Sequence, residues 1–317
     1  MSSEEFVRGM FYLSLTVVGV PSNIAVVVAF LLLIYRENRL LAADAIILHL
    51  ACTNLLVVVV RCLMETLASF YLANVFGDTG CRIVIFIYRT SRALSIWLTF
   101  LLSAYQCLSI APPGSRWATA RAILAQYLVF IFVFLWVLNT TMSQAAILFT
   151  FSTKNNFSLT NNAVNVQYCH VNFPSKLSKE INGALQVGRD VVPMALMTLA
   201  SLIIVALLYK HSQQVKVLRS GSRGSGGAEQ RTAKAVVVLV TMYVILYGVD
   251  NGLWVYTLTV KTTMSSSLIS DLRVFFASLY SALSPLVIIA SNRKVNSNLR
   301  CAAQEKPDLE KSTYQSK

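Results

Sequence analysis

Long apolar runs alternate along the chain with short polar segments. Each run reaches about 20 residues, the length that a helix needs to cross the hydrocarbon core of a bilayer. Membrane-spanning strands would instead alternate apolar and polar residues over about 10 positions, and Ile24–Ile34 is continuously apolar. The pattern predicts an all-α bundle of seven transmembrane helices, near residues 9–34, 45–71, 81–110, 122–149, 184–209, 233–258 and 271–291.

The segments outside these runs are short. Residues 1–8 contain Glu4 and Glu5, with no basic leader and no small-residue cleavage site, so we expect the first run to serve as an uncleaved insertion signal. No internal repeat is visible. The sequence therefore predicts an extracellular N-terminal segment, one membrane domain over 9–291 and a tail over 292–317.

Composition favours the bilayer as the solvent for this chain. Hydrophobic residues make up 56% and charged residues only 13%, with a mean hydropathy of +0.61. Soluble domains carry about 25% charged residues. The net charge of +13 would suit nucleic acid only as a basic patch on a soluble fold. Because the basic residues lie between apolar runs, we expect a multi-pass plasma-membrane protein in contact with lipid, and no nucleic-acid partner.

Lys and Arg are shared unevenly between the two ends of the predicted bundle. Short cytoplasmic loops carry the excess of basic residues. One end receives Arg36, Arg39, Arg116, Arg121, Lys210, Lys216, Arg219, Arg223, Arg231, Lys234, Arg293, Lys294, Arg300, Lys306, Lys311 and Lys317. The other end shows mainly Arg8, Lys154, Lys176, Lys179 and Lys261. We therefore expect the C-terminus in the cytoplasm and the N-terminus outside.

Two features of the predicted outer face agree with this orientation. Asn156 begins an Asn-Phe-Ser glycosylation acceptor in the long loop after the fourth run, whereas a second match at Asn139 lies inside that run, beyond the reach of the glycosylation machinery. Cys81 and Cys169 both lie on the oxidising side. A disulfide between them would hold the loop over the bundle.

The remaining thiol and imidazole groups predict no catalytic or metal site. Cys52, Cys62 and Cys107 fall within spans, where a buried apolar thiol is the expected role. Cys301 fits either palmitoylation or a plain solvated thiol. The histidines are scattered, at His49, His170 and His211. With no nucleophile–base motif or metal-ligand cluster, we expect neither an enzyme nor a cofactor.

Ionisable side chains inside spans are costly, so each is a candidate functional residue. The outer half of the predicted bundle holds Arg61, Glu65, Arg89, Arg92, Arg189, Asp190, Asp250, Asp271 and Arg273. Arg89 and Arg92 are three apart and share a helix face, and Arg61 and Glu65, four apart, are spaced to pair. The inner half is nearly uncharged.

Two interpretations of these charges stay open. Five arginines and four acids can simply neutralise one another in a polar interior. Alternatively, they line an outward-open pocket for an anionic or strongly polar ligand, because guanidinium donates two parallel hydrogen bonds to a carboxylate. The expected ligand contacts are then Arg89 and Arg92, with Arg61, Glu65, Arg189 and Asp250 around them. Steroids and neutral volatiles remain open as ligands, and a cationic amine is disfavoured.

The stretch Tyr88–Trp117 combines several specific motifs. Its distinctive residues are Arg89, Arg92, Leu94, Ser95, Leu102, Ser103, Gln106, Pro112, Ser115, Arg116 and Trp117. Further motif residues are His49, Leu50, Asn54, Tyr168, Cys169, Tyr247, Asp250, Ser284 and Pro285. With seven spans and the cysteine pair, the chain resembles rhodopsin-like G-protein-coupled receptors, and specifically the vomeronasal type 1 receptors and related fish olfactory receptors of class A.

The chain also departs from most rhodopsin-like receptors. Tyr105-Gln106-Cys107 occupies the place of the Asp-Arg-Tyr triplet, and Asn54 stands where an acid normally supports a sodium site. Ser284–Ile288 replaces Asn-Pro-x-x-Tyr, and the Trp-x-Pro segment of span six is absent. These absences argue against an amine or peptide receptor. Within the family, Ala111-Pro112-Pro113 and the Gly/Ser-rich inner loop are atypical.

The resemblance implies a pheromone or odorant receptor that activates an inhibitory-class G protein as spans five and six part. Pro193 and Pro285 either supply bend points or mark static kinks. The basic loop 210–234 meets either the G protein or anionic lipid. The residues expected to face the G protein are Gln106, Arg116, Lys216 and Arg219.

A secondary transporter of a small anion is the alternative from another class. Transport would require polar groups that continue toward the inner side, usually with a detectable repeat. The charges stop in the outer half and no repeat is visible, so the receptor is favoured.

Overall fold

The computed structural model describes residues 3–38, 40–71, 77–110, 116–152, 163–166, 169–218, 226–259, 266–292 and 294–297. Within these ranges, seven helical segments are long and apolar enough to cross a membrane, which confirms the predicted number of spans. They are α1 (Ser3–Glu37), α2 with η1 and α3 (Ala42–Val57, Val58–Leu63, Met64–Ser69), α4 (Asp78–Ile110), α6 with α7 (Leu128–Met142, Ala145–Phe149), α8 (Lys176–Leu218), α9 (Gly226–Thr259) and α10 (Ser266–Ser291).

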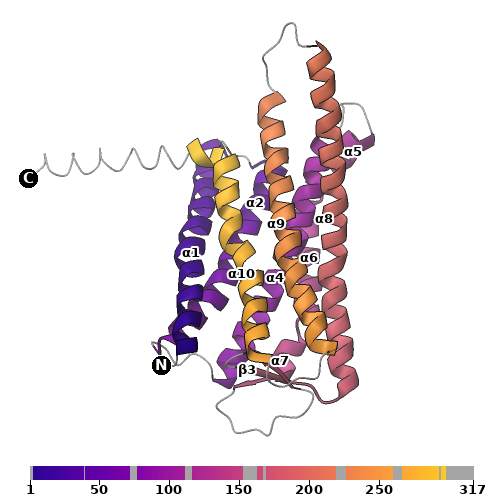
Figure 1. Ribbon diagram of the computed structural model, residues 1–317. Coiled ribbons are helices and arrows are strands. Elements are labelled where there is room, and N and C mark those ends of the chain that lie inside the picture. The colour runs from indigo at the N-terminus through magenta and orange to yellow at the C-terminus, as the bar shows by residue number, and fades with distance from the viewer. Residues whose placement is uncertain are drawn as a thin grey trace, which may run out of the picture.

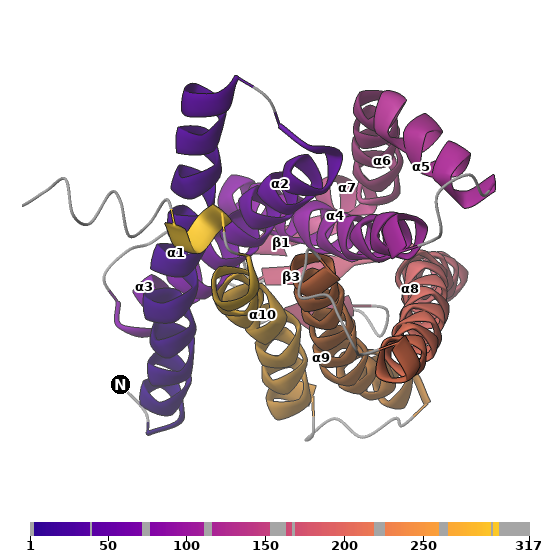
Figure 2. The ribbon, with the colours of Figure 1, turned by 90° about the horizontal axis from the view of Figure 1, so that it is seen from above.

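These helices form one bundle, with α4 in its interior (Figures 1 and 2). Helix α4 packs against α2, α6, α8 and α9, so its side chains meet most of the other spans. Large apolar side chains such as Phe130 of α6, 72% exposed, cover the outside. Polar side chains such as Asn54 are fully buried instead. This is the distribution that a bilayer favours, because lipid tails solvate the apolar surface and the backbone is satisfied within each helix.

The fourth predicted span is broken near its beginning. Helix α5 (Arg116–Gln126) precedes α6 and has no buried residues. Tyr127 separates the two helices, although the backbone N–H of Ile131 still donates to its carbonyl at 3.0 Å. The apolar segment that can cross the membrane begins at Leu128.

The second span contains a wide π-helical turn, η1, between α2 and α3. The chain has four consecutive valines at the start of this turn, Val57–Val60, and β-branched side chains crowd an ordinary helical turn. Gly19 of α1 lies against this turn: a Cβ there would be 3.0 Å from Val58 Cγ2 and 3.1 Å from Ala282 of α10. Glycine therefore permits α1, η1 and α10 to approach closely.

The long loop after α7 forms a small sheet, which the sequence did not predict. Strands β1 (Thr150–Ser152), β2 (Ala163–Val166) and β3 (Cys169–Asn172) are antiparallel in the order β1–β3–β2. The sheet crosses the end of the bundle at which the N-terminus lies (Figure 1). The candidate glycosylation site Asn156 and the thiol of Cys301 lie outside the described residues.

Candidate functional site

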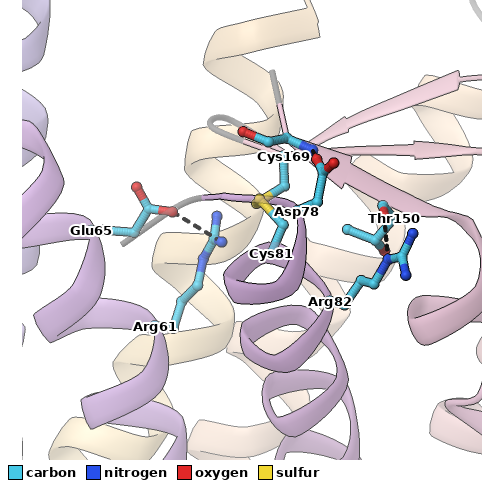
Figure 3. The surroundings of a disulfide bond; sticks show 8 residues. Arg61, Glu65, Asp78, Cys81, Arg82, Thr150 and Cys169 are labelled. Carbon is cyan, nitrogen blue, oxygen red and sulfur yellow. Dashed lines mark hydrogen bonds and ion pairs between the residues drawn. A yellow bond between two sulfur atoms is a disulfide. The ribbon is translucent and has the colours of Figure 1, made fainter. Parts of the chain in front are cut away.

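A disulfide fixes the sheet to the bundle. Cys81, in the first turn of α4, is bonded to Cys169 at the start of β3, with 5.7 Å between the Cα atoms (Figure 3). Both cysteines are buried. The predicted bridge is therefore confirmed, and it holds the loop across the end of the bundle.

Two polar side chains on the same stretch of α4 add to this attachment (Figure 3). Asp78 accepts a hydrogen bond from the backbone N–H of Ser152 through Oδ1, at 2.7 Å. Arg82 donates from Nε to the carbonyl oxygen of Thr150, at 3.2 Å. Strand β1 is therefore attached to α4 beside the disulfide.

Inside the bundle, ionisable side chains from four helices meet. Arg92 of α4 contacts Asp190 of α8, with 3.2 Å from Nη2 to Oδ2, and its Nη2 also contacts Oδ2 of Asp250 of α9. Arg273 of α10 reaches Oδ1 of Asp250 with Nε at 3.2 Å. Arg189 of α8 donates from Nε to Oδ1 of Asp190 at 3.1 Å. We call these five side chains the ionic layer.

Arg89 lies one turn before Arg92 on α4 but has different surroundings. Its side chain is half-buried, and its Nη1 is buried without an acceptor among the described residues. The charged groups that act on it most strongly are the guanidiniums of Arg189, Arg273 and Arg92. Together with Arg89, four guanidiniums face the two carboxylates of the ionic layer, so positive charge is in excess among the described side chains.

A tyrosine cluster supports the ionic layer on the side away from the sheet. The ring of Tyr247 lies 4.9 Å from Cζ of Arg92 and stacks on Tyr243, with 4.1 Å between the ring centroids. Tyr280 of α10 meets Tyr243 edge-on at 4.7 Å, and all three tyrosines are fully buried. Sequence reasoning missed Tyr243 and Tyr280. The spacing of Tyr243, Tyr247 and Asp250 on one face of α9 was the available signal.

The predicted pair in the second span is present. Arg61 Nη1 lies 2.9 Å from Glu65 Oε1, and both side chains are only 1% exposed. Cζ of Arg61 lies 5.7 Å from the ring of Tyr88. Tyr88 also interacts electrostatically with Arg92 and Asp250. Tyr88 is therefore linked electrostatically both to this pair and to the ionic layer.

Farther from the sheet, the helices are joined by uncharged groups. Asn54 of α2 donates from Nδ2 to Ser284 Oγ of α10 at 2.9 Å. It accepts from Ser95 Oγ of α4 at 2.6 Å. We call these residues the neutral trio. All three side chains are fully buried, and both ends of the Asn54 amide are used.

The remaining predicted residues fall in different places. Gln106 is buried in α4, whereas Arg116 is exposed at the start of α5. The side chain of Lys216 and the whole of Arg219 lie outside the described part of the chain. Asn139 is buried and donates to the carbonyl of Leu135 at 2.8 Å, in agreement with its prediction as a span residue. At the end opposite the sheet, Lys294 Nζ lies 2.8 Å from Asp44 Oδ2.

The chain is similar to one family of receptors over nearly all its length. The model of the "Vomeronasal organ pheromone receptor family" matches residues 6–301. "Olfactory receptor class A-like protein 1" of Danio rerio is 36% identical over 300 residues, 94% of this chain and 93% of that protein. "Vomeronasal type-1 receptor 3" of Homo sapiens is 30% identical, over 76% of this chain and 78% of that protein.

A solved structure shows the same fold. Squid rhodopsin superimposes with a TM-score of 0.71, covering 97% of this chain and 86% of that chain, at 15% sequence identity. At so low an identity the likeness concerns the helix arrangement alone.

Proposed function

This chain belongs to the vomeronasal organ pheromone receptor family, and we propose that it binds a small anionic ligand at Arg89 and activates an inhibitory-class G protein. The family and the rhodopsin-like fold make it a chemosensory G-protein-coupled receptor of the plasma membrane. The ligand class, the ligand-binding residues, the orientation and the class of G protein are the proposal.

The guanidinium of Arg89, which has no carboxylate partner among the described residues, supports the anionic ligand. An ionisable group within a span is costly unless it is paired, and the charged groups that act most strongly on Arg89, among the described residues, are three further arginines. A carboxylate would accept two parallel hydrogen bonds and offset part of the excess positive charge. Among the described side chains, mutual neutralisation accounts for Arg61 with Glu65 and for the acids of the ionic layer, but it gives Arg89 no carboxylate partner. The side chain of Asp271 lies outside the described residues.

The remaining candidate contacts take different roles in this proposal. Arg92 and Arg189 interact electrostatically with Arg89, and Asp250 contacts Arg92. In the proposal these three residues line the ligand site, although each already contacts another charged side chain. Arg61 and Glu65 are occupied with each other and shape the wall through Tyr88. The sheet crosses the end of the bundle at which the N-terminus lies, so in this proposal the ligand lies between the sheet and the tyrosine cluster.

The proposed orientation places the sheet outside the cell. A disulfide forms on the oxidising side of the membrane, and the sheet carries one. The N-terminus lies at the same end (Figure 1). The opposite end, where the sequence gathers its basic residues, then meets the G protein, with Gln106, Arg116, Lys216 and Arg219 as the expected contact region.

The test is a signalling assay with paired probes. Cells that express the receptor would be exposed to benzoate, hexanoate and further carboxylates, each beside its uncharged amide. We expect responses to carboxylates alone, blocked by a toxin that inactivates inhibitory G proteins. Arg89→Gln should raise the half-maximal concentration at least about tenfold, the equivalent of about 1.4 kcal/mol of ligand affinity.

Arg82→Gln is the matched control, because Arg82 lies two turns earlier on α4 and serves the sheet. It should respond as the wild type does at equal surface expression. A carboxylate response that survives Arg89→Gln would refute the Arg89 site. Responses limited to neutral steroids would refute the anionic ligand, and toxin-resistant signalling would refute the class of G protein.

A further inference from the structure

We infer that the contacts of Arg92 with Asp190 and Asp250 hold the unliganded receptor inactive, and that an anion bound at Arg89 loosens them. This inference rests on the proposed function, because it assigns the regulation of the same site. The two arginines share a helix face but have different roles: Arg89 binds the ligand, and Arg92 changes its contacts when the ligand is bound.

One nitrogen of the Arg92 guanidinium contacts both aspartates, while another has no partner among the described residues. Both of its carboxylate contacts are made by one nitrogen, Nη2, which donates a hydrogen bond to Asp250 and lies 3.2 Å from Oδ2 of Asp190. Its Nε is buried and has no partner within the described part of the chain. A carboxylate binds a guanidinium through two adjacent N–H groups in parallel. An anion that uses the free Nε–H as one of the pair therefore needs Nη2 as the other and competes with an aspartate.

Arg89 places the anion where this competition occurs. It precedes Arg92 by three residues on α4, so the two side chains are neighbours on the helix surface. A carboxylate held by Arg89 is consequently within reach of Arg92. The excess of guanidiniums favours its entry, and each aspartate keeps a second partner when Arg92 turns away. Asp190 keeps Arg189, and Asp250 keeps Arg273.

The consequence for the helices follows from where those second partners lie. Arg189 is on α8 with Asp190, while Arg273 ties α9 to α10 through Asp250. Loss of the Arg92 contacts therefore releases α8 and α9 from α4 but leaves α9 joined to α10. The ring of Tyr247, 4.9 Å from Arg92 Cζ, loses its cation contact at the same time. Release of α8 and α9 is the change that opens the opposite end of the bundle.

The experiment measures basal signalling by the full-length chain, without ligand, at matched surface levels. Asp250→Asn removes the charge that Arg92 contacts and should raise basal G-protein activation roughly fivefold, because an active population of about 0.1–10% leaves room for such a rise. Asp190→Asn is the second variant and should raise it less, because Arg189 also occupies that carboxylate. Asp78→Asn is the matched control, since it makes the same chemical change at the sheet and should stay at the wild-type level.

The outcomes separate this inference from the proposed function. A rise in Asp250→Asn or Asp190→Asn without a rise in Asp78→Asn supports it, and if Asp250→Asn does not reach the surface, Asp190→Asn decides. Wild-type basal signalling in the surface-expressed variants overturns it, while a carboxylate response of the wild type leaves the proposed function intact. An equal rise in all three variants also overturns it, because any lost carboxylate would then loosen the bundle.

Discussion

The ionic layer and the neutral trio connect the same helix, α4, to its neighbours, only one turn apart along its axis. In the trio, the Asn54 amide donates to Ser284 and accepts from Ser95, so both of its ends are satisfied within the protein. In the ionic layer, Arg92 keeps a free Nε, and the adjacent Arg89 has a buried Nη1 with no acceptor in the described part of the chain. The trio is complete without a ligand, whereas the charged region has donors to spare.

We therefore expect the neutral trio to hold the helices together and the charged region to bind the ligand. Uncharged hydrogen bonds between membrane helices contribute modestly, about 0.6 kcal/mol on average, and they do not attract ions. Unpaired guanidiniums cost stability and are useful only when an anion arrives. Substitution of Arg92 or of a residue of the neutral trio should therefore lower stability, whereas substitution of Arg89 should not.

The largest effect is expected from Arg92→Gln. Asp190 and Asp250 would lose the cation that they share, and removal of one partner of a buried ion pair typically costs about 3–5 kcal/mol. Thermal unfolding of the purified receptor in detergent should show a strongly lowered midpoint. A midpoint equal to that of the wild type would contradict the view that Arg92 holds the helices together.

A smaller loss is expected in the neutral trio. Asn54→Leu would leave the hydroxyls of Ser95 and Ser284 without their amide partner, at a cost of about 1–3 kcal/mol. The same thermal assay measures it, and Ser95→Ala, which removes one hydrogen bond, should cost about 0.6 kcal/mol. If Asn54→Leu lowered the unfolding midpoint more than Arg92→Gln, the neutral trio would contribute more to stability than the ionic layer.

The smallest effect on the unliganded protein is expected from Arg89→Gln. Because Arg89 has no carboxylate partner among the described residues, its removal should leave the unfolding midpoint unchanged or slightly raised. A saturating carboxylate should then stabilise the wild type but not the variant, since a ligand stabilises the state that binds it. A marked loss of stability in Arg89→Gln would show that this side chain serves the fold.

Much of the fold could be predicted because a bilayer leaves few alternatives. A spanning segment must satisfy its backbone internally, so a long apolar run such as Ile24–Ile34 becomes a helix whatever lies beside it. The sheet escaped prediction because β3 has only four residues, Cys169–Asn172, and depends on pairing with both β1 and β2. The break at Tyr127 likewise lacks a strong local signal.

The charged residues of the site were predictable, but most of their contacts were not. Arg89 and Arg92 stood out because charges inside spans are rare, and their spacing placed them on one face. Spacing alone does not distinguish Arg89 from Arg92 as a ligand contact. Only packing shows that Arg92 contacts two aspartates, while the charged groups that act most strongly on Arg89 are further arginines. The within-span pair of Arg61 and Glu65 was predictable because both partners lie on one helix.

The seven spans, the charged residues of the interior and the family follow from the amino-acid sequence alone, because these depend on local composition and on motifs within single helices. The tertiary structure decided which charges are paired and which is left over. Arg92 and Asp250 are 158 positions apart, and no pattern along the chain fixes which faces of α4 and α9 meet. That choice belongs to the packing of α4, α8, α9 and α10, which brings four guanidiniums around two carboxylates and leaves Arg89 unpaired among the described residues.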